Sequence, residues 1–288
     1  MAIDSGFEQK ASHPGAGSAG CEWYSVEGII YDRHGGREID GHPLASAAWL
    51  NVLNPATDAP AQVILTVYHE RREPTEHAFS APPTRSTRLD LHDLPEIGPR
   101  NQQFALRLRA DRPIFPQHTW ADYRPLRPIP EDMESVTLFP GPLGASHRHW
   151  IFPDMYQGMD DERVWYEKEI LTLLNPGDVD STVDITFYDG FWLGAKNHRT
   201  APYERPVRLT VPARRVLAVR LFDLVEVPRY GAGNVRPGGA HGFNMQRALR
   251  LECSAPIVPQ KTRRCQVHFD DTIIGEWTSI GLVTAEGA

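Results

Sequence analysis

The chain has 288 residues, which is enough for about two domains that each bury a core of their own. Its hydrophobic content of 41% and charged content of 23% are ordinary for a soluble globular protein. The formal net charge of −7 argues against a nucleic-acid-binding protein, which usually carries a basic face. No apolar run approaches the ~20 residues of a membrane-spanning helix, so no membrane insertion is expected.

Residues 1–20 contain two acidic residues and then mostly Gly, Ala, Ser, His and Pro. They lack the basic start and apolar centre of a signal peptide, so we expect a disordered lead-in and a cytoplasmic protein. The cysteines are Cys21, Cys253 and Cys265. They are odd in number and have no metal-type spacing, which favours reduced thiols.

The first half is predicted to consist of short strands separated by turns. Apolar residues alternate or cluster in each candidate strand, and Asn54–Pro55 is typical of a turn. The expected strands cover 23–28, 47–53, 63–68, 104–109 and 113–119. The chain contains 25 prolines and 23 glycines and no long segment with a helical period. This pattern predicts antiparallel β-sheets, packed as a sandwich in each half.

Residues 125–145, with Pro128, Pro130 and Pro140, are predicted to be an interdomain linker. The second half then carries two enlargements, at 190–205 and 228–242. Five glycines between Gly231 and Gly242 could let the backbone approach a ligand. The segment lacks the Lys-Ser ending of a P-loop, so a flexible surface loop is the favoured interpretation.

The second half repeats the first. Corresponding residues lie 127 positions apart for Trp23 and Trp150, 121 for Asn54 and Asn175, 130 for Leu94 and Leu224, and 143 for Pro113 and Pro256. The offset changes only between these anchors, as loop insertions would make it do. A repeat of this length indicates two copies of one domain, which we place at 21–124 and 146–288.

These anchors resemble the sensory rhodopsin transducer family of small bacterial β-sandwich proteins. In the second half the resemblance is carried by Trp150, the turn 174–178, the strand 184–188, and the segments 209–215, 222–224 and 255–260. In the first half it is carried, more weakly, by Trp23, Glu27–Gly28, Leu53–Asn54, Arg85, Asp93–Leu94 and 117–119. The paired arginines of the second copy, Arg214 and Arg215, correspond to Thr84 and Arg85.

The resemblance implies an all-β chain of two tandem antiparallel β-sandwich (jelly-roll-like) domains. It also implies assembly into an oligomer, which is tetrameric in the single-domain members, so that a tandem chain could build the same arrangement as a dimer. The implied function is binding of a small molecule, such as a sugar or a related metabolite. Only a few members of the family serve a photoreceptor, and the duplication and the long insertions argue against a rhodopsin partner here.

Two pairs of residues stand at equivalent places on the first strand of each copy, Trp23 with Glu27 and Trp150 with Asp154. A carboxylate four residues after an indole is expected on the same face of a strand. Such a pair suits sugar recognition, because the indole stacks on the C–H face and the carboxylate accepts hydrogen bonds from hydroxyls. The alternative is a core tryptophan beside a carboxylate paired to an arginine.

Polar residues near other strands are further candidates for ligand binding. They are Gln117, His118, Arg214, Arg215, Gln260, Lys261 and Arg263. His118 and Lys261 have apolar neighbours and could face a ligand, although a capped strand end explains them equally well. The two arginines could hold a carboxylate or phosphate by bidentate bonds, or could form a subunit contact.

No metal or other cofactor is expected, and no catalytic residue is assigned. His147 and His149 share a strand face, but a metal site needs a third ligand that the sequence does not identify. No nucleophile motif is visible. A glycosidase-type pair among Asp270, Asp271 and Glu276 stays open, because it depends on a separation that sequence does not give.

Three hypotheses follow. The leading one is a cytoplasmic protein that binds a small polar molecule, such as a saccharide, beside Trp23 and Glu27 or Trp150 and Asp154. The second is a carbohydrate-active enzyme, a hydrolase or lyase, which we consider the minority interpretation. The third is a signalling adaptor that acts through protein contacts and should show a large exposed apolar patch.

Overall fold

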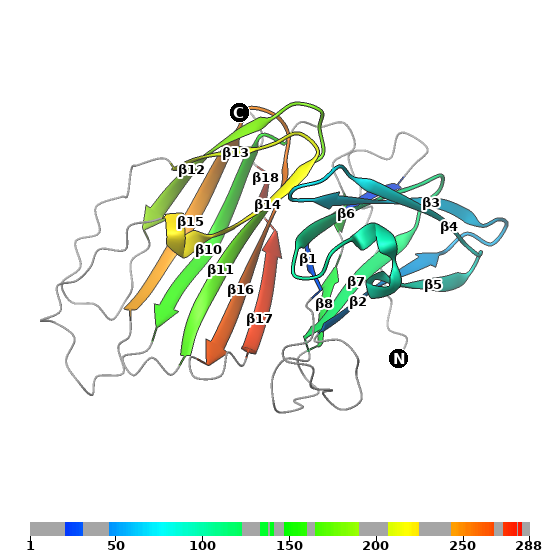
Figure 1. Ribbon diagram of the computed structural model, residues 1–288, viewed down its shortest axis with the longest axis horizontal. Helices are drawn as coiled ribbons and strands as arrows, with labels where there is room; N and C mark the ends of the chain where they lie inside the picture. The colour runs from blue at the N-terminus through cyan, green and yellow to red at the C-terminus, as the bar shows by residue number, and fades with distance from the viewer. Residues whose placement is uncertain are drawn as a thin grey trace, which may run out of the picture.

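The computed structural model describes residues 21–30, 46–122, 133–137, 139–140, 147–159, 165–189, 207–224, 243–267, 273–280 and 282–283. Within these ranges nearly all regular structure is β-strand (Figure 1). The exceptions are the short helices η1 (Leu91–Asp93), η2 (Pro95–Ile97) and α1 (Leu221–Leu224). The expected lead-in 1–20 and the enlargements 190–205 and 228–242 lie outside the described residues.

The first domain is a sandwich of two antiparallel sheets. Its first sheet has the order β4 (Thr75–Ala81), β3 (Ala61–His69), β6 (Gln103–Ala110), β1 (Cys21–Ile29) and β9 (Phe139–Pro140). Its second sheet has the order β5 (Arg85–Asp90), β2 (Ser46–Asn54), β7 (Phe115–Asp122) and β8 (Met133–Thr137). The segment 125–145, expected to be a linker, therefore contributes β8 and β9 to this domain.

The second domain has the same arrangement of strands. Its first sheet has the order β13 (Val207–Val211), β12 (Ser181–Asp189), β15 (Phe243–Cys253), β10 (His149–Met159) and β18 (Leu282–Val283). Its second sheet has the order β14 (Arg215–Arg220), β11 (Trp165–Asn175), β16 (Val258–Val267) and β17 (Ile273–Ile280). The two sheets are joined where β10 meets β11, at Met159 and Tyr166.

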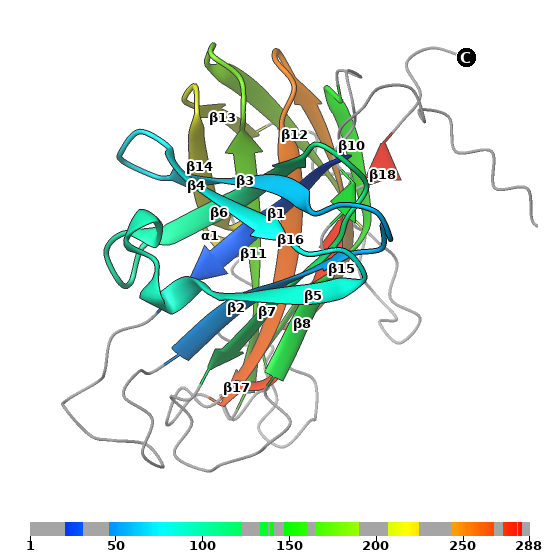
Figure 2. The same cartoon turned by 90° about the vertical axis from the view of Figure 1, so that its right-hand side faces the viewer.

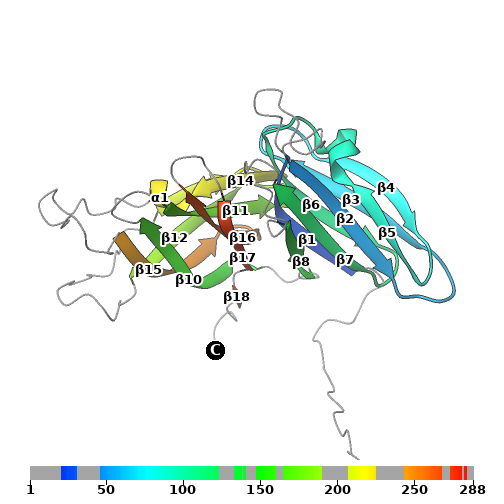
Figure 3. The ribbon, with the colours of Figure 1, turned by 90° about the horizontal axis from the view of Figure 1, so that it is seen from below.

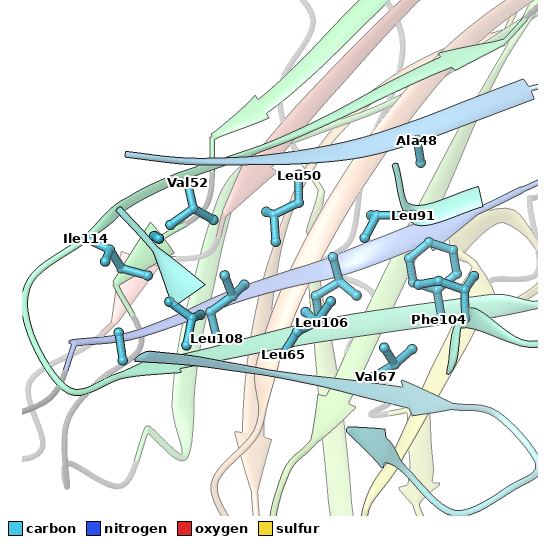
Figure 4. Close-up of a cluster of buried hydrophobic side chains, with 14 of the residues drawn as sticks. Ala48, Leu50, Val52, Leu65, Val67, Leu91, Phe104, Leu106, Leu108 and Ile114 are labelled. Atoms are coloured by element: carbon cyan, nitrogen blue, oxygen red, sulfur yellow. The ribbon is translucent and has the colours of Figure 1, made fainter. Parts of the chain in front are cut away.

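In the described ranges, β10 to β18 thus repeat β1 to β9 in order and in pairing. The expectation of an all-β chain with two tandem antiparallel sandwiches is confirmed. Each sandwich buries its own core because one face of each strand is apolar. Along β2, for example, Ala48, Leu50 and Val52 are buried while the residues between them are half-exposed. Figure 4 shows Leu50 and Val52 pointing toward Leu65, Leu106 and Leu108 of the facing sheet.

Both copies have a β-bulge at the same place in their first strand. In β1 the pairing with β6 shifts between Ser25 and Gly28, so two residues stand opposite Ala105. In β10 the shift lies between Phe152 and Met155, 127 positions later, opposite Ala248. A bulge of this kind reverses the face to which the following residues point. Glu27 and Asp154 are the corresponding second residues of the two bulges.

The repeated Asn-Pro turn also has one structure in both copies. The side-chain amide of Asn54 donates to the carbonyls of Ala59 (3.1 Å) and Ala81 (2.9 Å), and its oxygen accepts from the N–H of Ala56 (3.0 Å). Asn175 makes the same three bonds with Val179, Val211 and Gly177 at 2.8–3.0 Å. One buried side chain therefore ties together three backbone segments, which explains its place among the anchors.

The second sheet of the second domain packs on the first sheet of the first domain. The apolar residues in this contact are Tyr24, Val26, Tyr68 and Ala105 from the first domain, and Leu174, Val216 and Val258 from the second. We call this contact the seam. Figure 3 shows β14 and β11 lying next to β6 and β1. In Figure 2 the strands of the two domains cross in projection.

Candidate functional site

The seam contains a group of buried polar side chains beside the bulge of β1. The side-chain oxygen of Gln260 accepts a hydrogen bond from the backbone N–H of Val26 (3.1 Å). The hydroxyl of Thr262 donates to the carboxylate of Glu27. All three side chains are buried, with exposures of 8% for Glu27, 2% for Gln260 and 1% for Thr262. The bulge thus turns Glu27 toward the second domain, where its carboxylate contacts Thr262 of β16.

Two polar atoms in this group have no hydrogen-bond partner in the part of the chain that the structure describes. They are the side-chain nitrogen Nε2 of Gln260 and the hydroxyl Oγ1 of Thr172. Gln260 and Thr172 stand opposite each other in β16 and β11 and face the seam. Leaving a buried polar group unpaired costs roughly 1–3 kcal/mol. The pair therefore marks a place where a small polar molecule could form hydrogen bonds.

The paired arginines link the domains at the rim of the seam. Arg214 has a positive φ of 57° and Arg215 begins β14. Both guanidinium groups contact Glu73 of the first domain, Arg214 at 3.9 Å and Arg215 at a shorter distance. The hydrogen bond from Arg215 lowers the pKa of the Glu73 carboxyl. These residues act as a contact between domains, although the sequence left a ligand role equally open.

His118 lies in the core of the first domain. Its Nδ1 is 2.9 Å from the hydroxyl of Ser25 on the facing sheet, and Nε2 has no partner in the described part of the chain. Burial lowers the pKa of His118 from its ordinary value of 6.5 to about 4. The imidazole is therefore neutral at physiological pH and packs between the sheets.

Stability should consequently fall at acidic pH. The pKa of His118 is lower in the folded state than in the unfolded state. As the pH falls from 6.5 toward 4, His118 is therefore protonated in the unfolded chain but still neutral in the folded chain, which favours unfolding. Between pH 7.5 and pH 5 we expect His118 alone to lower the free energy of unfolding by about 2 kcal/mol. Urea titrations at both pH values measure it. Burial also lowers the pKa of His69 to about 4, so His69 contributes to the same pH dependence of stability. This contribution should remain when His118→Gln removes that of His118. An unchanged pH dependence in His118→Gln would contradict the assignment.

Lys261 occupies the position in the second domain that His118 occupies in the first. Its ammonium group donates to the carboxylate of Glu169 at 2.9 Å, and the two side chains are 3% and 0% exposed. Glu169 lies on the same face of β11 as Leu171 and Leu173, which pack in the core of the second domain. The ion pair therefore points into the sandwich and not into the seam. Lys261 is thus part of the core, and its partner Glu169 was not among the predicted site residues.

The two tryptophans pack in the cores. Trp150 is 4% exposed and its indole N–H donates to the carbonyl of His147 (3.0 Å), while Trp23 packs against the core of the first domain. Trp23 and Glu27 do not share a face, because the bulge between them turns Glu27 toward the second domain. The expectation that an indole and a carboxylate four residues apart would form one surface is wrong for this pair.

The remaining candidates are spread over the molecule. Gln117 is exposed on the outer face of β7. Asp154 lies in the bulge of β10 and Arg263 in β16 opposite Glu169, and only their backbones are described. Within the described residues, no group of three His, Cys, Asp or Glu side chains is placed to hold a metal ion. In the same ranges, no helix is both long and apolar enough to cross a membrane.

Comparison with known proteins finds a family model that is similar to the first domain. Residues 19–127 match the family model described as Anabaena sensory rhodopsin transducer. The resemblance to the sensory rhodopsin transducer family is thereby confirmed. The matched residues lie in the first copy, although we expected the second copy to carry the stronger resemblance. None of the curated proteins compared with the chain matches it.

Two solved structures are similar to parts of the chain. The crystal structure of Thermotoga maritima 1070 is 19% identical, with a TM-score of 0.34, and the match covers 41% of this chain and 92% of that one. The Anabaena sensory rhodopsin transducer is 27% identical, with a TM-score of 0.28, and the match covers 34% of this chain and 85% of that one. Each match therefore spans less than half of the present chain.

Proposed function

We propose that the protein is a cytoplasmic small-molecule-binding protein whose ligand, a sugar or sugar-derived metabolite, binds in the seam beside Gln260. The observation that supports this proposal is the pair of buried, unpartnered polar atoms on Gln260 and Thr172. Small-molecule sites occur preferentially between domains, and they combine apolar walls with a few polar groups.

The groups around the pair suit a ligand rich in hydroxyls. The amide nitrogen of Gln260 is a donor, the carboxylate of Glu27 is an acceptor, and the hydroxyl of Thr172 can be either. The apolar residues of the seam, among them Tyr24 and Tyr68, would cover the C–H faces of such a ligand. Binding would pair the two atoms and offset the cost of burying them.

The first test is a thermal-shift screen against neutral hexoses, uronic acids and hexose phosphates. A ligand that binds only the folded protein should raise the midpoint of unfolding with its concentration. We expect a hit in one of these classes that is lost in Gln260→Leu and retained in Gln62→Leu, since Gln62 is an exposed glutamine near the start of β3, whereas Gln260 is buried in the seam. A shift that survives in Gln260→Leu would remove the seam as the site. Turnover of the same hit would instead make the protein an enzyme.

Self-association belongs to the same proposal. The family implies an oligomer, and a tandem chain could supply two of four domains, so we propose a homodimer. One observation favours contact with another protein chain. Leu53 and Phe115 stand opposite each other on the second sheet of the first domain and are 40% and 57% exposed. We propose that this apolar pair forms part of the surface through which the chains bind each other.

A further inference from the structure

The place proposed for the ligand is closed in this structure. The side chains of Thr172 and Gln260 are 0% and 2% exposed, and they face a domain that packs directly against them. A small molecule can therefore reach these two residues only when the second sheet of the second domain moves away from the first sheet of the first domain. Domain movements of this kind take microseconds to milliseconds. The contacts that hold the two sheets together thus control access to the site.

An apolar row lies between the polar pair and the rim of the seam. Leu174 stands opposite Val216 in β14 and Val258 in β16, and all three pack against the first domain. Thr172 lies two residues before Leu174 on the same face of β11, whereas Arg215 precedes Val216 at the start of β14. The contact made by Arg215 is therefore at the edge of the seam, one apolar row away from the site.

The paired arginines are held in place by the turn before β14. The N–H of Arg214 donates to the carbonyl of Gly177 (2.9 Å), and the guanidinium of Arg215 donates to the carbonyl of Arg214 (3.0 Å). The first copy has the same turn. There the N–H of Thr84 donates to the carbonyl of Ala56 (3.0 Å), and the φ of Thr84 is 55° where that of Arg214 is 57°. The backbone thus does not require arginine here, and the arginine pair occurs in the copy whose turn meets the other domain.

Glu73, which meets these arginines, is held by the tip of the β3–β4 hairpin. Arg72 and Thr75, on either side of it, both donate to the carbonyl of Glu96 in η2, at 3.0 Å and 2.7 Å. Nε2 of His69 lies 3.2 Å from the Thr75 hydroxyl, which closes the neck of the hairpin. The tip is therefore fixed to its own domain, and little conformational freedom is lost when Glu73 contacts the arginines.

This contact is exposed and charged, whereas the interior of the seam is buried. The side chain of Glu73 is 67% exposed and that of Arg215 is 19% exposed. An exposed ion pair shifts an equilibrium by about two- to fivefold, and dissolved salt weakens it. An effect of this size does not decide whether the domains fold, but it changes the fraction of molecules in which the seam is open.

We propose that the ion contact between Glu73 and the paired arginines is a latch that regulates opening of the seam, and with it the entry of a small molecule to the site beside Gln260. The rate of entry then scales with the open fraction, since the molecule enters from the open state. A rise in ionic strength releases the latch. The role in ligand entry rests on the proposed function, whereas the opening itself is measured without a ligand.

Hydrogen exchange at the amide of Val26 measures the opening. Its N–H donates to the side chain of Gln260 across the seam, so this bond breaks when the domains part. We expect Glu73→Gln to speed the exchange of this amide about three- to fivefold at low salt. Arg215→Gln should give an increase of this size or smaller, and the double variant should match Glu73→Gln, because both changes remove one contact. Raising NaCl from about 0.02 M to about 0.5 M should speed exchange in wild type and leave the double variant unchanged.

Thiol labelling measures the access of a small molecule directly. Thr172→Cys places a thiol at the site, and iodoacetamide, which is small and neutral, reaches that thiol only when the seam is open. We expect Glu73→Gln to speed labelling at position 172 by the same factor as it speeds exchange at Val26. Mass spectrometry of the peptide that carries position 172 reads the label separately from the native cysteines.

Asp184→Asn is the matched control, because it removes an exposed ion pair with Arg208 on the sheet of the second domain that is not in the seam. It should leave both rates unchanged. The amide of Leu106, in β6 between β1 and β3, reports unfolding of the first domain and should also keep its rate. Unchanged exchange at Val26 in Glu73→Gln, or an equal increase at Leu106, would overturn the latch. A failed thermal-shift screen would instead overturn ligand binding and leave the measured opening as it is.

Discussion

Replacing Lys261 with methionine should lower the free energy of unfolding by about 3–5 kcal/mol, the usual loss when one partner of a buried ion pair is removed. The carboxylate of Glu169, whose side chain is 0% exposed, would lose the ammonium group that lies 2.9 Å from it in the core. Methionine keeps most of the volume of lysine, so the loss is electrostatic rather than a packing defect. Urea denaturation followed by circular dichroism measures the change.

Two controls separate the charge from other effects. The double variant Lys261→Met/Glu169→Leu removes both charges and should recover most of the lost stability. Arg208→Met breaks the exposed pair of Arg208 with Asp184, at 2.7 Å and 2.9 Å, and should change stability little because water already solvates both groups. If Lys261→Met lowered the free energy of unfolding no more than Arg208→Met, the buried ion pair would contribute nothing to stability.

Asn175→Ala is expected to cost about 3 kcal/mol, because one substitution removes three hydrogen bonds and leaves buried backbone groups unpaired. The carbonyls of Val179 and Val211 and the N–H of Gly177 lose their partners together. Asn175 is fully buried, so water cannot replace the amide without opening the turn. The same urea titration measures the loss.

The repeat supplies the matched comparison. Asn54→Ala should destabilise the first domain by a similar amount, since Asn54 makes the equivalent three bonds. Gln62→Ala removes an amide from an exposed position and should stay within about 0.5 kcal/mol of wild type. A loss in Asn175→Ala as small as that in Gln62→Ala would show that the turn forms without its side-chain bonds.

The duplication and the turns were readable from sequence because their chemistry is local. Asn54 and Asn175 bond mainly within a few residues of themselves, so the Asn-Pro signature carries its own structure. The spacing of 127 that links Trp23 with Trp150 also links the two bulges. These anchors predict that the second copy repeats the fold of the first, and the strand order of the two domains agrees with that prediction.

The bulge is what misled the interpretation of Trp23 and Glu27. Assigning alternate residues to opposite faces assumes that the strand pairs with its neighbour without a bulge. One extra residue reverses the face to which every later residue of the strand is assigned. A signal was present in the second copy, where Pro153 stands inside the bulge and proline is tolerated in strands mainly at bulges and edges. Gly28 is a second signal in the sequence, because glycine inside a strand often marks a bulge or a close approach. In the structure a side chain at this position would collide with the ring of Phe104.

Partners that are distant in sequence could not be chosen from composition alone. Nothing near Arg215 indicates Glu73, and nothing near Gln260 indicates the backbone of Val26. For Glu169 the sequence does contain a signal. Glu169 falls on the same strand face as the buried Leu171, and a carboxylate buried at such a position needs a cation. That requirement would have directed attention to Lys261 as a core residue.

The strands β8 and β9 have a practical consequence for dissecting the chain. A first domain cut after residue 124 would lose both, and so expose the edges of β7 and β1 that they cover. Bare strand edges recruit other chains, and the shortened fragment would be prone to aggregate for a reason unrelated to its core. Proteolytic or recombinant fragments of this domain should therefore run through Pro140, so that their behaviour reports on the fold and not on where it was cut.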